Sequence, residues 1–493
     1  MTIKSPHIGL KQLRPTAGIQ MPMAAPQQAP DPLGLIIDTL LRFNEKKLAR
    51  DLIRAFYNNA TILEQLDHIA RLAMIVKDYQ TSISACLVVL DMLTKQITFN
   101  PDAIYAARSN LINVLAHANH PIKALEYIRV QESIRPIDQD RDLKKAYCLF
   151  LSLRRDEAET ILNSILNDPT IDNKTRREIE FNLGTYDLWN GRFKSGIRRF
   201  MKYGSEFNTW DRPALTHIHE WNGNIQVGRI VIVIAEAGIG DEFINIRFAK
   251  QIMDSGMHVA WVTNRTDLHS VFSRSIGCQM YSTLAECLVD HSNNVAGYCY
   301  SMNLPILLDL DVSDLWTGPY ITPDPEYVKL HRDDIIRTDE VVESPIIGVR
   351  WSGNADYDQD NHRTIPYDQI VNACNTFING RIYSLQKDSG VEYIDERVVD
   401  LSNKLNTWED TIAIISLLDI VVTSCTAIAH IAGAMGVPTI VLPPISAYYT
   451  WCYDGTKSPW YGESTIVLHQ QVPEDWKPSL DLVKKYTLQL LMK

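Results

Sequence analysis

The chain has 493 residues, of which 45% are hydrophobic and 22% charged, and its formal net charge at pH 7 is -11. This length allows two or three domains with substantial cores, and the acidic balance gives no general attraction to nucleic acid or anionic membranes. The 8 cysteines form no CxxC pair and no zinc-ligand spacing, so we expect free thiols, no structural metal and a cytoplasmic protein. No apolar run approaches the ~20 residues of a membrane helix, so we expect no membrane span.

The N-terminal part of the chain changes character after about thirty residues. Residues 1–32 include "RPTAGIQMPMAAPQQAPDP", which is rich in Pro, Ala and Gln and shows no sustained period. This composition predicts a flexible arm. From residue 33 to 205 the sequence has almost no Gly, and apolar residues recur at intervals of three and four. That period predicts a domain of amphipathic α-helices.

The helical region contains a repeated small residue. Small residues that open the second helix of each pair lie 36, 39, 34 and 38 residues apart, at Ala49, Ala85, Ala124, Ala158 and Gly196. These intervals scatter around the ~34 residues of a tetratricopeptide repeat, in which a small residue lets two helices cross closely. Residues 181–200 match that repeat best, with Gly184 at the crossing and Asn190-Gly191 as the turn. The alternative is an irregular helical bundle.

A different pattern begins near residue 227. Short β-branched runs, "RIVIVIAEAG", "HVAWVTN", "PIIGVRWSG", "GRIYSLQ", "DIVVTSC" and "PTIVLPP", alternate with helical segments. Such alternation predicts parallel sheets built from βαβ units. The runs form two groups, so we predict two Rossmann-like domains, residues 206–335 and 336–493, facing each other across a cleft.

Polar residues follow three strands of the second group. Ser424, Thr426 and Ala427 open a helix after "DIVVTSC", and a helix that begins with small residues offers free N–H groups to a phosphate. His430 lies one turn further on the same face as Thr426. The alternative is that Thr426 only caps the helix and His430 is a core histidine.

The other two strand ends are also polar. Ser352 and Gly353 follow "GVRW", with Arg363 in the next polar loop, while Gln386 and Lys387 follow "YSL". Hydroxyls, amides and cations at neighbouring strand ends suit an anionic ligand. Ordinary solvated loops are the alternative for each segment taken alone.

The first group has its own candidate site in "AEAGIGDEF". Gly238, Gly240, Asp241 and Glu242 occupy the junction of a strand and a helix, which lies at the carboxyl end of a parallel sheet, where ligands bind. The alternative for Asp241 is an N-cap of a helix beginning near Phe243.

Taken together, residues 220–461 resemble glycosyltransferases that carry tetratricopeptide repeats before a domain related to lipopolysaccharide heptosyltransferases of glycosyltransferase family 9. The resemblance to protein O-linked N-acetylglucosamine transferases is more distant. It rests on the order of "GRIVIVIAEAGIGDEF", "YCYSMNLPILLDL", "GVRWSGNADYDQDNHRTIP", "SLQK", "DIVVTSCTAIAHIAGAMGVPTIVLPP" and "YYTWCYDGTKSPWY". It implies a GT-B fold in which the C-terminal domain binds a nucleotide-sugar and the N-terminal domain carries the catalytic base.

The resemblance also implies residue roles. Asp241 would be the general base of an inverting transfer, with Glu236 and Glu242 as substitutes, and no metal or cofactor would be needed. Arg363 and Lys387 would neutralise the diphosphate. The remaining donor-site residues would be Gly238, Gly240, Ser352, Gly353, Gln386, Ser424, Thr426, Ala427 and His430. Two departures from the family pattern are Cys425, where relatives carry Asp before Thr-Ala, and Cys452, where a basic residue is expected.

These features predict a glycosyltransferase whose helical repeats recruit a hydroxyl acceptor, either a protein or a glycan. One alternative is a catalytically inactive scaffold that binds partners through the repeats. Another places a modified nucleobase of phage-type DNA as the acceptor, because a local basic face is formed by Arg192, Lys194, Arg198, Arg199 and Lys202.

Overall fold

The computed structural model describes residues 31–97, 100–205, 218–291, 293–336, 345–355, 357, 359–375, 381–387 and 396–492. The predicted arm lies outside this part of the chain, apart from Asp31 and Pro32. The chain divides into two compact units at Thr175 and Arg176, in the first turn of a helix. No helix among the described residues is long and apolar enough to cross a bilayer.

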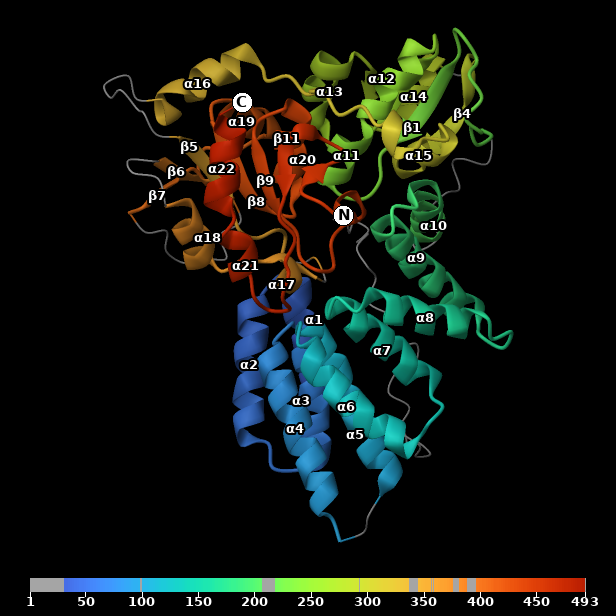
Figure 1. The fold of residues 1–493 in the computed structure, drawn as a ribbon, viewed down its shortest axis with the longest axis vertical. Coiled ribbons are helices and arrows are strands. Elements are labelled where there is room, and N and C mark those ends of the chain that lie inside the picture. The colour runs from blue at the N-terminus through green and yellow to red at the C-terminus, as the bar shows by residue number, and fades with distance from the viewer. Residues whose placement is uncertain are drawn as a thin grey trace. The chain divides into compact units, whose positions relative to one another are not determined.

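The first unit is entirely helical in its described part. It comprises α1 (Pro32–Arg42), α2 (Lys46–Asn59), α3 (Leu63–Ile75), α4 (Tyr79–Lys95), α5 (Pro101–His117), α6 (Pro121–Ile134), α7 (Gln139–Leu151) and α8 (Arg155–Leu166). Each helix from α1 to α8 packs against the next one along the chain, as the blue and cyan helices of Figure 1 illustrate. This confirms the predicted helical region.

One turn geometry recurs in every helix pair from α1/α2 to the pair α9 (Asn173–Trp189) and α10 (Phe193–Ser205). The second residue after each first helix has left-handed backbone geometry, with φ between 59° and 70°. The next N–H then donates to a carbonyl five residues earlier, as from Glu45 to Leu40 at 2.8 Å and from Arg192 to Asp187 at 2.8 Å. This is the Schellman motif, which ends a helix and reverses the chain. The left-handed residues are Asn44, Lys77, Asn119, Leu153 and Gly191.

The small residues predicted to open the second helices are buried. Ala49, Ala124 and Ala158 are fully buried and each is the fourth residue of its helix, as is Gly196 of α10. In α4 the fourth residue is Ser82, whose hydroxyl donates to Ala70 O at 2.7 Å. The predicted Ala85 is also buried but lies three residues later. The sequence pattern therefore placed the small residue of this pair almost one helical turn too far along the chain.

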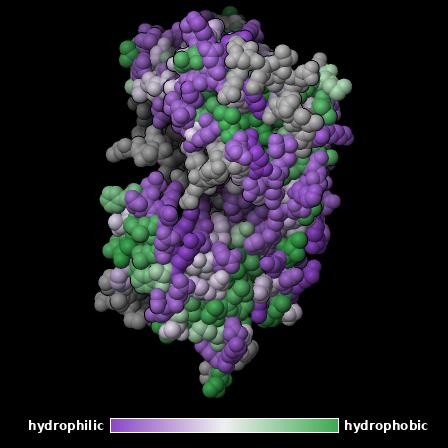
Figure 2. Space-filling view, turned by 90° about the vertical axis from the view of Figure 1, so that its left-hand side faces the viewer, coloured by the Kyte–Doolittle hydropathy of each residue, from purple (hydrophilic) through white to green (hydrophobic). Residues whose placement is uncertain are grey.

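The surface of the helical unit carries exposed apolar side chains. Figure 2 shows hydrophobic residues gathered in the lower part of the view, over the helical unit. Large apolar side chains that are exposed in this unit include Leu35, Phe43, Leu48, Phe56 and Ile75. Apolar side chains that gather on a surface mark interaction sites more often than isolated ones do.

Helices α9 and α10 cross closely at two glycines. A Cβ added at Gly184 would lie 2.7 Å from Phe200 N, and one at Gly196 would lie 2.9 Å from Gly184 O. No larger side chain fits without moving backbone, which explains both glycines and confirms the predicted crossing. These helices belong to the second unit, where α10 packs against α15 (Leu304–Leu307). The compact unit therefore begins ahead of the boundary at residue 205 that the sequence predicted.

The N-terminal lobe of the second unit is a parallel sheet with strand order β3-β2-β1-β4. Its strands are β1 (Ile230–Ile234), β2 (His258–Val262), β3 (Gln279–Tyr281) and β4 (Val295–Tyr300). Its helices are α11 (Ile239–Asn245), α12 (Arg247–Asp254), α13 (His269–Ile276), α14 (Leu284–His291) and α15. β1 lies between β2 and β4 and is buried along almost its whole length, as its run of β-branched residues predicts.

The C-terminal lobe has the strand order β10-β11-β9-β8-β5-β6-β7. Its strands are β5 (Ile346–Arg350), β6 (Arg381–Ser384), β7 (Val398–Asp400), β8 (Ile420–Ser424), β9 (Thr439–Leu442), β10 (Lys457–Ser458) and β11 (Gly462–Val467). All pairs are parallel except β10/β11. Without β10 this is the doubly wound Rossmann order.

The helices of the C-terminal lobe are α17 (Asp360–Arg363), α18 (Tyr367–Cys374), α19 (Trp408–Ser416), α20 (Ala427–Met435), α21 (Lys477–Leu480) and α22 (Val483–Leu491), and α16 (Pro325–Ile335) packs on α19. The described chain is thus a helical region followed by two Rossmann-like lobes, as the sequence predicted.

The two lobes meet along α11 and α20, which lie side by side in Figure 1. A Cβ on Gly240 would lie 3.1 Å from the His430 ring, so this glycine allows the close approach. Arg274 of α13 adds a bidentate ion pair with Glu409 of α19, at 2.8 and 2.6 Å. Arg247 is buried between the lobes and donates to Trp316 O at 2.9 Å and Trp460 O at 2.6 Å.

Candidate functional site

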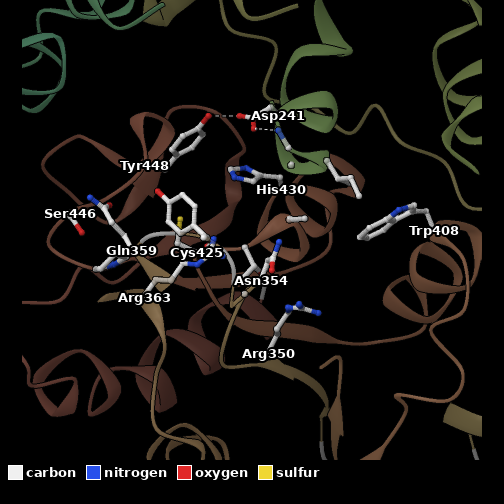
Figure 3. Close-up of a pocket in the computed structure, with 18 of the residues that line it drawn as sticks. Asp241, Arg350, Asn354, Gln359, Arg363, Trp408, Cys425, His430, Ser446 and Tyr448 are labelled. Carbon is white, nitrogen blue, oxygen red and sulfur yellow. Dashed lines mark hydrogen bonds between the residues drawn. The ribbon is translucent and has the colours of Figure 1, made fainter. Parts of the chain in front are cut away.

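A cavity of about 600 Å³ lies between the lobes. Four strands point their carboxyl ends at it, because Gly238 follows β1, Gly353 follows β5, Cys425 follows β8 and Pro444 follows β9. Ligands of doubly wound α/β folds bind at this edge of the sheet. Figure 3 shows side chains from both lobes directed toward this space.

Asp241 is the acidic side chain among the described residues that line the cavity. It is the third residue of α11, which begins at Ile239, so it is not the N-cap of a helix beginning near Phe243. Its Oδ2 accepts from Gly238 N at 2.9 Å, and its Oδ1 accepts from the Tyr448 hydroxyl (Figure 3). Burial raises the pKa of Asp241 to about 6, and these two hydrogen bonds oppose part of that rise. A carboxylate with this pKa is suited to accept a proton near neutral pH.

Arg363 contributes a positive charge from the C-terminal lobe. Its Nε donates to Asp360 Oδ1 at 2.9 Å, its Nη1 donates to Cys425 O at 3.0 Å, and its guanidinium lies 4.5 Å from the centre of the Tyr357 ring. A Cβ on Gly353 would lie 2.0 Å from Arg363 Nη2, so Gly353 makes room for the guanidinium. These contacts hold the Arg363 guanidinium beside the turn that precedes α20.

Two further arginines line the cavity. Arg350 ends β5 and donates to Ser352 O at 3.0 Å and to Leu385 O at 2.9 Å. Arg265 comes from the N-terminal lobe, where it pairs with the buried Glu242 and donates to Ala237 O at 2.9 Å. The charged side chains of the described cavity lining are therefore three guanidinium groups and one carboxylate, which favours an anionic ligand.

The start of α20 also faces the cavity. Thr426 is its N-cap with extended backbone geometry and makes no side-chain capping bond. Thr426 and Ala427 line the cavity, where the first N–H groups of a helix lack intrahelical acceptors and its dipole favours negative charge. The start of α20 is therefore open to an anionic ligand, and the phosphate cradle stays a prediction.

His430 lines the cavity but carries no charge there. Its ring stacks on Trp451 with centroids 5.0 Å apart, and its Nδ1 lies 2.9 Å from the Tyr461 hydroxyl. Burial lowers the pKa of His430 to about 3. His430 is therefore a buried, neutral histidine that also borders the cavity, and its role toward a ligand stays a prediction.

Four predicted donor-site residues do not line the cavity. Ser352 and Gln386 bond to each other instead, from Ser352 N to Gln386 Oε1 at 3.2 Å, and Ser424 is fully buried at the end of β8. Lys387 is exposed and donates to Asn406 O at 3.2 Å. The sequence placed these residues at the correct edge of the sheet, but their side chains point elsewhere.

The two substitute acids also lie outside the cavity lining. Glu242 is fully buried and paired with Arg265, and burial raises its pKa. Glu236 is buried and accepts from Met302 N at 3.3 Å. Among these neighbouring acids Asp241 alone reaches the cavity.

Several lining residues were missed by the sequence analysis. Arg350 and Arg265 lie at or just beyond the ends of β5 and β2, so a systematic search of strand ends would have found both. Tyr448 and Trp408 carried no such signal. Tyr448 belongs to an aromatic run that follows β9, and Trp408 is the first residue of α19.

The described residues contain no group of three or more His, Cys, Asp or Glu side chains able to hold a metal ion. The metal independence that the resemblance implies stays a prediction.

Comparison with known proteins adds a similarity in fold. No family model matches the sequence, and no curated protein matches it. A family 9 glycosyl transferase from Veillonella parvula is 10% identical with a TM-score of 0.40, covering 55% of this chain and 99% of its own. The ADP-heptose lipopolysaccharide heptosyltransferase II of E. coli is 12% identical with a TM-score of 0.35, covering 52% and 98%.

An O-GlcNAc transferase variant from Thermobaculum terrenum covers more of the chain. It is 11% identical with a TM-score of 0.30, over 87% of this chain and 93% of its own. In fold the chain resembles glycosyltransferases. With identities of 10–12% and TM-scores of at most 0.40, the function is inferred from the site itself.

Proposed function

We propose that this protein is an inverting glycosyltransferase that moves a sugar from a nucleotide-sugar to a hydroxyl acceptor. One observation carries the proposal: a single cavity combines a buried carboxylate of raised pKa with three arginines and the first turn of a helix. A nucleotide-sugar needs both features, because its diphosphate is an anion and its acceptor must lose a proton.

In the proposed reaction Asp241 accepts the proton of the acceptor hydroxyl while that oxygen attacks the anomeric carbon. The bond between this carbon and the diphosphate oxygen breaks on the opposite face, so the configuration inverts. Negative charge then develops on the departing diphosphate. Arg363, Arg350 and the N–H groups at the start of α20 stabilise it through charge-assisted hydrogen bonds.

The arginines and the α20 turn would supply this stabilisation without a metal ion. Transfer is then expected to continue at full rate in excess EDTA. Loss of activity in EDTA that Mg²⁺ or Mn²⁺ restores would contradict metal independence while leaving the transferase assignment in place.

The helical unit is proposed to recruit the acceptor. Its exposed apolar side chains support this role, since such surfaces bind partners. The basic face of α10 gives little support to a DNA acceptor, because Arg192 and Arg199 pair with Asp187, and Lys194 and Arg198 pair with Asp309. A protein or glycan acceptor is therefore preferred.

A panel of nucleotide-sugars tests the function through release of nucleoside diphosphate, with and without cell-extract glycans and proteins as acceptors. The parent should release nucleoside diphosphate from one donor class, and Asp241→Asn should lower the rate by about 10²–10⁴-fold while still binding nucleotide. Below about pH 6 the parent's kcat/KM should fall as Asp241 becomes protonated. No turnover and no nucleotide binding would instead support the inactive scaffold.

A further inference from the structure

The Asp241 carboxylate is fixed by donors from both lobes. Gly238 N, from the N-terminal lobe, donates to one oxygen at 2.9 Å. The other oxygen accepts from Tyr448, which lies in the segment after β9 of the C-terminal lobe (Figure 3). Tyr448 also lines the cavity. The orientation of the carboxylate therefore depends on a side chain distant in sequence.

Tyr448 is suited to remain a hydrogen-bond donor. Burial and the neighbouring Asp241 raise the pKa of its phenol well above the ordinary value. The phenol therefore keeps its proton throughout the working pH range and does not compete with Asp241 as a base. A neutral hydroxyl that donates to a carboxylate stabilises the charged form of that carboxylate.

The ring of Tyr448 packs against the last helix pair. Phe200 of α10 meets it edge-on, with centroids 6.1 Å apart and an interplanar angle of 83°. Phe200 also contacts Tyr449 at 5.1 Å and Phe181 of α9 at 4.7 Å. An unbroken series of aromatic contacts thus leads from α9 through α10 to the residue that binds Asp241.

We propose that Tyr448 is a positioning residue that orients the Asp241 carboxylate, and that α10 sets the position of Tyr448 through Phe200. The α9/α10 pair is then a working part of the site as well as the last pair of the helical series. The inference rests on the proposed function for its meaning in catalysis, but its geometry is independent of any substrate.

The substitution Tyr448→Phe removes none of the other charged or titratable groups around Asp241. They are Glu242 on the same helix, Arg265 after β2, Cys425 before α20, Arg363 of α17 and Tyr449. His430 of α20 is neutral at working pH. A change in Asp241 titration on loss of one hydroxyl therefore reports the bond to Tyr448.

The test is a pH titration of the full-length protein labelled with ¹³C at the aspartate carboxyl groups. The Asp241 resonance is assigned from its absence in Asp241→Asn. We expect a midpoint near pH 6 in the parent and a midpoint about one pH unit higher in Tyr448→Phe, because one donor to the charged form is lost. Tyr449→Phe removes a neighbouring hydroxyl and should leave the midpoint unchanged.

A second pair of variants tests the role of α10. Phe200→Leu should raise the midpoint in the same direction as Tyr448→Phe, because the Tyr448 ring loses its edge-on contact with the Phe200 ring and keeps only that with Tyr449 among the ring contacts described. Phe193→Leu is the matched control, since Phe193 lies on the same helix but contacts Trp460, at 6.0 Å. Thermal melting of each variant confirms that it is folded at the temperature of the titration.

An unchanged midpoint in Tyr448→Phe would overturn the positioning role, and equal midpoints in the Phe200 and Phe193 variants would overturn the contribution of α10. Both results are independent of turnover. Shifted midpoints in a protein that transfers no sugar would retain the positioning role and reject the proposed reaction. Sugar transfer with unshifted midpoints would reject the positioning role and retain the proposed reaction.

Discussion

Burial controls the chemistry of Asp241. Its carboxylate is almost completely removed from solvent, and the donors Tyr448 and Gly238 only partly compensate the lost hydration, so its pKa rises to about 6. In the unfolded chain the same group titrates near pH 4. The folded protein therefore binds an additional proton between these two pH values.

This difference predicts a pH-dependent effect of Asp241→Asn on stability. Because the folded pKa is raised, the contribution of Asp241 to stability is fully present below about pH 4 and is lost as the pH rises through about 6. The free energy of unfolding of Asp241→Asn, relative to that of the parent, should therefore increase by on the order of 3 kcal/mol between pH 4 and pH 7. Urea unfolding across this range measures it, and a constant or shrinking difference would contradict the raised pKa.

The cations of the cavity give a second residue-level prediction. Arg363 lines the cavity, whereas Lys387 donates to Asn406 O outside it. Arg363→Ala should weaken binding of ADP or UDP by about 10–100-fold, the usual range for a lost charge-assisted hydrogen bond. Lys387→Ala should change it less than about twofold. Calorimetry measures the nucleotide affinity of both variants. A larger loss of affinity with Lys387→Ala than with Arg363→Ala would favour the role that the sequence predicted for Lys387.

Sequence patterns predicted where the site lies more reliably than they predicted which side chains line it. The strand-end rule found Asp241, Gly353, Arg363 and Thr426, which line one cavity. It also selected Gln386 and Ser424, which point into the protein. Both faces of a central parallel strand are buried, so alternation along the sequence does not show which residue faces the ligand.

Among the helices and strands, the crossing of α9 and α10 agrees most closely with what the sequence predicted. An alanine in place of glycine normally stabilises a helix by about 1 kcal/mol. At Gly184 the added Cβ would lie 2.7 Å from Phe200 N and 3.0 Å from Gly196 O, and both are backbone atoms. The packing penalty should therefore reverse the usual sign.

Gly184→Ala is accordingly expected to lower the free energy of unfolding by about 2 kcal/mol. Ser195→Ala, an exposed position on α10, should change it by less than about 0.5 kcal/mol. Denaturant unfolding monitored by circular dichroism measures both variants. A more stable Gly184→Ala protein would show that the helices do not cross as closely as described.

Some elements were invisible in the sequence. The strands β4 (VAGYCY) and β11 (GESTIV) were not predicted. β4 contains Gly297, at which an added Cβ would lie 2.9 Å from Trp221 N, and β11 begins with four small or polar residues. Both strands are set by pairing with a neighbour, β1 for β4 and β9 for β11, and such tertiary context outweighs local propensity.

At the level of the whole second unit, Arg247 connects the lobes. It is buried, and its guanidinium lies 4.6 Å from the Tyr320 ring and 4.8 Å from the Tyr461 ring. It donates to Ile244 O, Trp316 O, Trp460 O and the Tyr320 hydroxyl. The charge is thus solvated by carbonyl dipoles and aromatic faces from both lobes.

Removing this guanidinium takes away the hydrogen bonds that it donates to these four acceptors. Arg247→Met should therefore lower the free energy of unfolding by about 3 kcal/mol. Arg198→Met removes an equal charge from a side chain that is 63% exposed and should cost less than about 0.5 kcal/mol. Denaturant unfolding compares them, and equal small losses would show that Arg247 does not hold the lobes together.

A crystal structure with bound ADP or UDP would show whether one cavity holds a diphosphate opposite a carboxylate base. The diphosphate is expected within hydrogen-bond distance of Arg363 and of the first N–H groups of α20, with Asp241 facing the position where the sugar would be attached. A diphosphate bound beside Lys387 with the cavity empty, or Asp241 directed away from the nucleotide, would contradict the proposed sugar transfer.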